Sequence, residues 1–487
     1  MLFNSLQFLI FFPAVTVVFF LLAHRHRCVW LLAASYYFYM CWVPYYIVLV
    51  LISTVVDYVA ALRMTNTQSP GRKFGYLIFS LCTNLGLLFT FKYFDFFNAS
   101  LRDIFGFFDA PYAVPALDLL LPIGISFYTF QTLSYTIDVY RGEQKPERNF
   151  GVFALYVTFF PQLVAGPIER PGRLLPQFRQ KKVWESQRVA DGLKLMVWGF
   201  FMKVVIADRL AMFVNAAYND PTDHGGISLT VATVFFAFQI FCDFSGYTNI
   251  AIGAAQVLGF NLMENFRRPY FAKSIRDFWR RWHISLSTWF RDYVYFPLGS
   301  NTRVKMSRSV ALVVVFLASG LWHGANWTFV VWGGLHGFYA LVGRATETSR
   351  RRLIDRVGLS RSPTLLKCWQ VLVTFGLVCV AWVFFRANTV SDGYYIVTHL
   401  ATGWHKALSL DTLIPAVLVG QHGHEFVIAV CAIGFMVFVQ ILQRHGSLRA
   451  RLSERPVWFR WGMYYAIIIA ILMLGKFDQQ QFIYFQF

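Results

Sequence analysis

The sequence VALVVVFLASGLWHGANWTFVVWGGLHGFYAL, residues 310–341, decides the fold, because it is apolar throughout yet broken near its centre by LWHGANW (321–327). Its first arm, Val310–Trp322, holds 13 residues, which climb only about 20 Å at roughly 1.5 Å per residue. The hydrocarbon core of a bilayer is about 30 Å thick, so the bend stops inside it. Non-helical backbone at that depth is tolerated only where it is buried in protein or lines a wet cavity. The stretch therefore predicts a hairpin that enters a membrane without crossing it fully, with functional residues at its bend.

The rest of the chain has the same apolar character. Of its 487 residues, 57% are hydrophobic and 14% are charged, whereas soluble domains are nearer half apolar and a quarter charged. No polar spacer is long enough for a separate domain, so we predict an all-α polytopic membrane protein with a single domain, residues 1–487. Residues 2–23 lack a basic leader and a small-residue cleavage site and are expected to be a retained first helix. The seven cysteines are scattered without a CxxC pair, which argues against a disulfide framework or a zinc site.

Apolar runs of suitable length predict the membrane spans. The candidate transmembrane segments are 2–23, 28–43, 45–62, 74–97, 119–138, 189–213, 228–259, 366–387, 425–443 and 458–475. Residues 149–166 are also apolar, but they lie between two basic loops, so a full crossing there would export one of those loops. We therefore expect residues 149–166 to re-enter the membrane without spanning it.

The charge of the loops sets the orientation. Residues 260–308 hold ten Lys/Arg against three Asp/Glu, and residues 344–367 hold seven against two. Residues 98–118 and 388–425 each hold one base against three acids. Because basic loops favour the cytoplasmic side, this pattern predicts that both termini lie outside. The net charge of +19 is explained by the same bias, so we expect a lipid bilayer and no nucleic acid as partner.

His323 lies at the bend of the 310–341 stretch, between Trp322 and Gly324. Ionisable groups at membrane depth are costly and mark a pathway or a reaction centre. The glycines allow close backbone approach, and Trp322 and Trp327 are candidates for the wall of a pocket. The alternative is a histidine bonded to a neighbouring carbonyl in a packed core. The functional interpretation is favoured.

A second motif, SIRDFWRRWHISLSTWFRDY, covers residues 274–293. Its apolar positions follow helical spacing, and Ser274 with Asp277 resembles an N-cap box. We predict an amphipathic helix at the cytoplasmic interface. The apolar stripe of this helix is explained by anchoring in the plane of the membrane. The arginines, which lie off the stripe, favour the binding of an anionic, phosphate-bearing donor. His283 lies beside the stripe and is expected to face protein.

A third motif, FCDFSGYTN (241–249), places an acid, a serine, a threonine and an asparagine inside an apolar run. Hydrogen bonding between helices and contact with substrate explain it equally well. Gln162 and Glu169, in FFPQLVAGPIER, are open to the same two interpretations. No GxSxG elbow, Walker A loop or HExxH motif occurs. The His-x-His pairs at 24 and 422 are only weak metal motifs, and we expect no metal.

Several of these motifs together resemble the membrane-bound O-acyltransferase family, and its alginate O-acetyltransferase-like bacterial branch in particular. The motifs are DFSGYTNIAIG (243–253), FWRRWHISLSTWFRDYVYFPLG (278–299), GLWHGANW (320–327) and GGLHG (333–337). The opening MLFNSLQFLIFFP and the AGPIERP element at 165–171 fit the same branch. The resemblance covers nearly the whole chain.

The resemblance implies a fold and an activity. The family fold is a ring of tilted transmembrane helices, with re-entrant and interfacial helices, around a central tunnel. The catalytic histidine falls on His323 and the second signature histidine on His283. The implied donor is cytoplasmic acetyl-CoA, with an acyl carrier protein thioester as the alternative, and no cofactor is bound permanently. The implied acceptor is an envelope or secreted polysaccharide of the alginate type, reached directly or through a periplasmic relay protein at the bacterial inner membrane.

Related members of the family acylate peptidoglycan or cellulose, or transfer D-alanine to teichoic acid, and these acceptors remain open. A neutral histidine suits a general base for an acceptor hydroxyl. We interpret His323 as that base and His283 as a polarising or orienting partner. Further substrate contacts are predicted at Trp279, Arg280, Arg281, Trp282, Arg291, Trp322, Asn326, His336, Asp243 and Ser245. A small-solute transporter and a scaffold for an envelope complex are the rival classes; a transporter usually shows repeat symmetry, and a scaffold would tolerate loss of both histidines.

Overall fold

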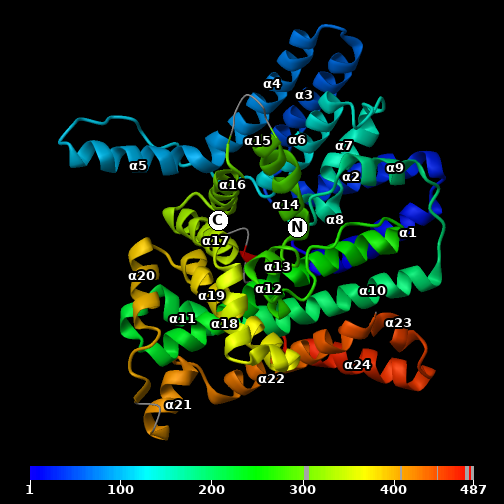
Figure 1. Cartoon of the computed structure of the whole chain (residues 1–487). Coiled ribbons are helices and arrows are strands. Elements are labelled where there is room, and N and C mark those ends of the chain that lie inside the picture. The colour runs from blue at the N-terminus through cyan, green and yellow to red at the C-terminus, as the bar shows by residue number, and fades with distance from the viewer. Residues whose placement is uncertain (301–305, 406–408, 447, 478–481, 484–487) are drawn as a thin grey trace. The chain divides into compact units, whose positions relative to one another are not determined.

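The protein is helical throughout the part of the chain that the structure describes. The computed structural model describes residues 1–300, 306–405, 409–446, 448–477 and 482–483, and every regular element in these ranges is a helix (Figure 1). The chain divides into two compact units. One comprises Met1–Met196 with Thr248–Met263, and the other comprises Val197–Tyr247 with Glu264–Phe487. The prediction of a single domain stays a prediction.

The helices follow one another in a simple order along the chain. In the first half they are α1 (Leu6–Leu21), α2 (His24–Met40), α3 (Ile47–Asn66), α4 (Pro70–Leu88), α5 (Phe94–Phe107), α6 (Ile125–Arg141), α7 (Phe150–Thr158), α8 (Phe160–Leu163), α9 (Pro171–Arg179), α10 (Ser186–Phe200), α11 (Asp208–Asn219) and α12 (Gly226–Leu258). In the second half they are α13 (Ile275–Trp279), α14 (Ile284–Phe290), α15 (Phe296–Ser300), α16 (Arg308–His323), α17 (Trp327–Ala345), α18 (Glu347–Arg356), α19 (Pro363–Arg386), α20 (Val390–His399), α21 (Leu410–Leu418), α22 (Gly423–Leu442), α23 (Leu448–Ser453) and α24 (Val457–Leu474).

Six helical segments among the described residues are long and apolar enough to cross a membrane. They are Pro44–Asn66, Pro70–Phe107, Gly226–Leu258, Pro363–Arg386, Gly423–Leu442 and Val457–Leu474. The multi-pass, all-helical prediction is confirmed. The predicted spans at 2–23, 28–43 and 119–138 overlap helices α1, α2 and α6, which have only 16 or 17 residues. The predicted span at 189–213 is divided by a π-helical segment, Phe201–Ala207.

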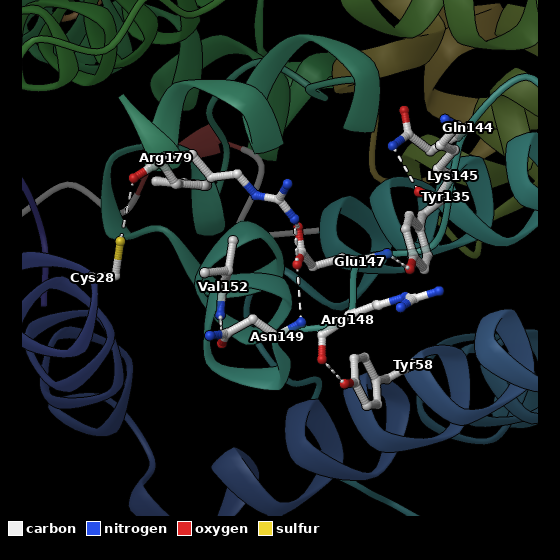
Figure 2. A network of polar contacts seen from close by, with 11 residues as sticks. Cys28, Tyr58, Tyr135, Gln144, Lys145, Glu147, Arg148, Asn149, Val152 and Arg179 are labelled. Carbon is white, nitrogen blue, oxygen red and sulfur yellow. Dashed lines mark hydrogen bonds and ion pairs between the residues drawn. The ribbon is translucent and has the colours of Figure 1, made fainter. Parts of the chain in front are cut away.

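The 149–166 segment forms helices too short to span. Helix α7 has nine residues and α8 has four, and about 20 residues are needed for a crossing. In the same unit, Glu147 anchors the loop that leads into α7 (Figure 2). Its carboxylate accepts hydrogen bonds from Arg179 of α9 at 2.6 and 2.7 Å, and from the Asn149 backbone N–H at 2.9 Å. The Tyr135 hydroxyl accepts from the Glu147 N–H at 2.9 Å. These contacts connect α6, α7 and α9.

Helices α16 and α17 form the hairpin that the sequence predicts, and they lie side by side (Figure 1). Helix α16 has 16 residues, or about 24 Å at 1.5 Å per residue, less than the thickness of the hydrocarbon core. A Cβ atom at Gly320 would collide with the carbonyl oxygen of Phe329, and one at Gly333 would collide with that of Phe316. Both glycines are therefore required for the close approach of the two helices.

The prediction of one amphipathic helix over 274–293 is wrong. The chain forms two short helices, α13 and α14, separated at Arg280–His283. The reason is tertiary hydrogen bonding: the Ile284 N–H donates to the Asn265 carbonyl at 3.0 Å, and the Arg267 N–H donates to the Arg281 carbonyl at 2.9 Å. Ser274 is the N-cap of α13, because the Asp277 N–H donates to its hydroxyl at 3.1 Å. The reciprocal half of the predicted box is absent among the described contacts, since the Asp277 carboxylate accepts from the Lys273 N–H at 3.1 Å.

A buried ion cluster ties the π-helical segment to its neighbours. The Lys203 ammonium lies 2.8 Å from Asp208 and 2.8 Å from Asp243, and all three side chains are buried. Asp243 also accepts a hydrogen bond from the Ile483 backbone N–H at 2.8 Å. Burying a charge is costly unless it is paired, so this cluster depends on all of its members.

Candidate active site

His283 and His323 meet in the second unit, although 40 residues separate them in the sequence. Their ring centroids lie 6.3 Å apart with an interplanar angle of 81°. Neither ring is more than 2% exposed. His323 ends helix α16 and His283 precedes helix α14. The tertiary fold therefore creates this pair, and its catalytic roles stay a prediction.

One hydrogen bond determines which nitrogen of His323 is basic. The Nδ1 atom lies 2.6 Å from the Ser319 carbonyl oxygen, one helical turn earlier. A carbonyl oxygen only accepts, so Nδ1 carries the proton and Nε2 carries the lone pair. The alternative interpretation of His323, a bond to a neighbouring carbonyl, is thus correct for Nδ1. It leaves the Nε2 atom as the basic nitrogen, so it does not exclude catalysis.

His283 adopts a backbone conformation that is uncommon for a residue other than glycine. Its φ is +42° and its ψ is +56°, in the left-handed region that non-glycine residues visit mainly in turns or strained sites. The ring packs edge-on against Phe244 at 4.6 Å and lies 5.8 Å from Trp322. Burial, with a smaller contribution from nearby His323, lowers the pKa of His283 well below its usual range. The ring is therefore neutral at physiological pH.

His336, on α17, is the third buried histidine of this cluster. Its Nδ1 accepts a hydrogen bond from the indole N–H of Trp279 at 3.2 Å. In the neutral ring the proton consequently resides on Nε2, the opposite of the arrangement in His323. The Trp332 ring lies 5.0 Å from His336 and 4.8 Å from His323. Trp279 and His336, both predicted substrate contacts, are thus contacts of each other.

Aromatic side chains enclose the histidines, and sequence reasoning missed several of them. Trp332 stacks on Trp382 of α19 at 5.8 Å, and Phe385 lies 5.5 Å from His323. Trp282, a predicted contact, lies 5.0 Å from Trp382. Trp382 lies close to the end of α19, where tryptophans of membrane spans are common, so its position gave no signal that it belongs to this cluster. Trp327, in contrast, is exposed and does not wall this cluster.

The predicted arginine contacts lie outside this buried cluster. Arg280 is exposed. Arg281 pairs with Asp277 at 2.9 Å, and Arg291 pairs with Asp292 at 2.8 Å. These ion pairs explain Arg281 and Arg291 without a bound ligand. Arg280 remains a candidate for binding an anion at the surface.

Three other predicted contacts have structural explanations. Asn326 is the N-cap of α17: its side chain accepts a hydrogen bond from the Thr328 N–H at 3.0 Å. Asp243 belongs to the ion cluster of Lys203. Ser245 is buried on α12. Among the described residues, no group of three or more His, Cys, Asp or Glu side chains is placed to hold a metal ion.

Comparison with known proteins identifies relatives over most of the chain. The family model of the membrane-bound O-acyltransferases matches residues 149–387. The chain is 39% identical over 438 residues to the probable alginate O-acetylase AlgI of Azotobacter vinelandii, covering 86% of this chain and 84% of that protein. Identity to the corresponding protein of Pseudomonas aeruginosa is 37% over 436 residues, covering 86% and 80%. Identity to the peptidoglycan O-acetyltransferase of Helicobacter pylori is 36% over 395 residues, covering 76% and 72%.

Proposed function

The chain belongs to the membrane-bound O-acyltransferase family, and from that premise we propose that it moves an acetyl group from cytoplasmic acetyl-CoA to an alginate-type polysaccharide. It is a multi-pass membrane O-acyltransferase. The observation that carries the proposal is the buried pair of His323, with its Nδ1 held by the Ser319 carbonyl, and His283. This pair supplies an oriented base in a buried site.

The proposed chemistry uses the Nε2 atom of His323 as general base. The oxygen of the acceptor hydroxyl attacks the carbonyl carbon of the thioester while Nε2 takes the hydroxyl proton. The tetrahedral intermediate then collapses, the carbon–sulfur bond breaks, and the departing thiolate takes the proton from His323. A positioned acid–base group contributes typically ~10²–10⁴-fold. His283 is neutral and acts by orienting or polarising the reactants, and burial protects the thioester from hydrolysis.

We place donor binding at the exposed arginines of residues 260–308. Arg276 and Arg280 are exposed there, and guanidinium groups bind phosphate oxygens well. Acetyl-CoA carries such phosphates. An acyl carrier protein, whose thioester is also attached through a phosphate, is the alternative donor.

The acceptor side of the proposal is an envelope or secreted polysaccharide, or a periplasmic relay protein that acetylates the polymer. This arrangement requires the basic loops to face the cytoplasm of the bacterial inner membrane, with both termini on the periplasmic side. The Helicobacter relative is named for peptidoglycan O-acetylation, so peptidoglycan is the second candidate acceptor. Acetylated cellulose and D-alanylated teichoic acid remain alternatives.

The test is transfer by purified protein in lipid vesicles. Acetyl-CoA labelled in the acetyl group is supplied, and label on alginate oligosaccharide or peptidoglycan fragments is measured. We expect label on the alginate oligosaccharide, and none from the His323→Ala variant. An acetylated carrier protein and a D-alanyl carrier protein are compared as donors. Transfer from one of these and none from acetyl-CoA would replace the proposed donor, and no transfer from any thioester would overturn the function.

A further inference from the structure

Three fully buried tryptophans adjoin the histidine cluster and carry polar N–H groups. They are Trp282, Trp332 and Trp382, each 0% exposed. Among the described residues, none of their indole nitrogens has a hydrogen-bond partner. Buried polar groups are normally hydrogen-bonded, and each one left without a partner destabilises the fold. Three such donors in one connected cluster therefore require an explanation.

His336 adds a fourth donor to the same cluster. Because its Nδ1 accepts from Trp279, its proton is on Nε2. No described residue accepts from this Nε2–H, and the side chain is fully buried. The ring of Trp332 contacts both His336 and His323, at centroid distances of 5.0 and 4.8 Å. Trp332 thus contacts both the ring that carries this donor and the ring of His323, the proposed base.

The chemistry of these groups defines the ligand that they fit. They donate hydrogen bonds and do not accept them, so they suit an oxygen with lone pairs and with no proton to give. A carbonyl oxygen that becomes negatively charged is such an acceptor. Donors fixed in a dry site before the reaction stabilise that developing charge more strongly than water does.

We propose that the Nε2–H of His336, together with the indole N–H of Trp332, binds the carbonyl oxygen of the acyl thioester and stabilises the oxyanion of the tetrahedral intermediate. This inference rests on the proposed function. His336 keeps its proton throughout, and the proton that moves is the one His323 takes from the acceptor hydroxyl. Trp279 is a positioning residue, because its N–H selects the His336 tautomer that can donate.

The test compares His336→Phe with His336→Gln in the reconstituted vesicle assay. Phenylalanine keeps a ring of similar size and removes the donor, whereas glutamine supplies an N–H in place of Nε2. We expect His336→Phe to lower kcat by about 10²–10³-fold, the usual cost of one oxyanion donor. The KM for acetyl-CoA should change by no more than a few-fold, because the donor acts mainly in the transition state. His336→Gln should recover at least tenfold of the lost kcat.

Three results overturn the inference. One is a folded His336→Phe protein with kcat near that of wild type, which would make His336 a packing residue. The second is a His336→Gln variant no more active than His336→Phe at equal membrane level. The third is wild-type protein that transfers no acyl group, in which case the proposed function fails as well. If wild type is active and His323→Ala is inactive, the proposed function stands, and a failed His336 comparison then refutes only the role of His336. If His336→Phe does not accumulate, Trp332→Phe makes the same comparison, with a loss of at least tenfold in kcat expected and unchanged kcat refuting it.

Discussion

Replacing Lys203 with methionine should destabilise the protein strongly, because the side chain neutralises two buried carboxylates. Its ammonium lies 2.8 Å from both Asp208 and Asp243. Methionine fills a similar volume and leaves the two acids facing each other without a cation. Removing one partner from a buried ion pair costs about 3–5 kcal/mol. We expect a loss of that size in the unfolding free energy, measured by titrating detergent-solubilised protein with sodium dodecyl sulfate.

Two further variants separate charge from packing. Adding Asp208→Asn and Asp243→Asn to Lys203→Met removes the uncompensated charges, and we expect it to recover at least half of the lost stability. Arg351→Met breaks an exposed pair with Glu347 and should cost less than about 1 kcal/mol. A Lys203→Met protein within about 1 kcal/mol of wild type would refute the reasoning. So would a triple variant no more stable than the single one.

Three other predictions concern charge and the second histidine. Burial raises the pKa of Glu169 to about 7, so the folded state keeps a proton that the unfolded state has released. The unfolding free energy should therefore fall by up to about 3 kcal/mol as pH rises from about 4.5 to 7. Glu169→Gln should flatten this pH dependence in thermal unfolding, and an unchanged pH profile would contradict the prediction. Arg280→Glu should raise the KM for acetyl-CoA several-fold, whereas Arg356→Glu, an exposed change in another basic loop, should not; equal effects would exclude a specific donor contact. His283→Ala should lower kcat for acetyl transfer, less severely than loss of His323, and an unaltered kcat would remove His283 from the mechanism.

The hairpin could be predicted from sequence because its cause is local. The length of the first arm and the glycines around His323 are visible in residues 310–341, and α16, α17 and their bend follow them. The proximity of His283 to His323 could be expected only from the family resemblance, since no spacing rule connects residues 40 positions apart. The ring of helices and the tunnel that the resemblance implies remain an expectation.

The features that sequence reasoning missed depend on tertiary contacts. Helical periodicity across 274–293 is genuine, but backbone hydrogen bonds of Arg281 and Ile284 with residues 265 and 267 interrupt the helix before α14. Lys203 was included in a predicted span together with Asp208, five positions later, but its second counterion, Asp243, lies 40 positions later and only the tertiary fold brings it close. Trp382 joins the cluster only because α19 packs against α17.

Polymer acetylation in cells that lack the native copy and express His323→Ala measures the role of this histidine most directly. Membrane levels are checked by immunoblot. His424→Ala is the matched control, because that side chain is 68% exposed and pairs with Glu425. We predict that His323→Ala inserts normally and loses acetylation by about 10²–10⁴-fold, while His424→Ala acetylates like wild type. Near-normal acetylation by His323→Ala at normal membrane level would contradict the assignment of His323 as the general base.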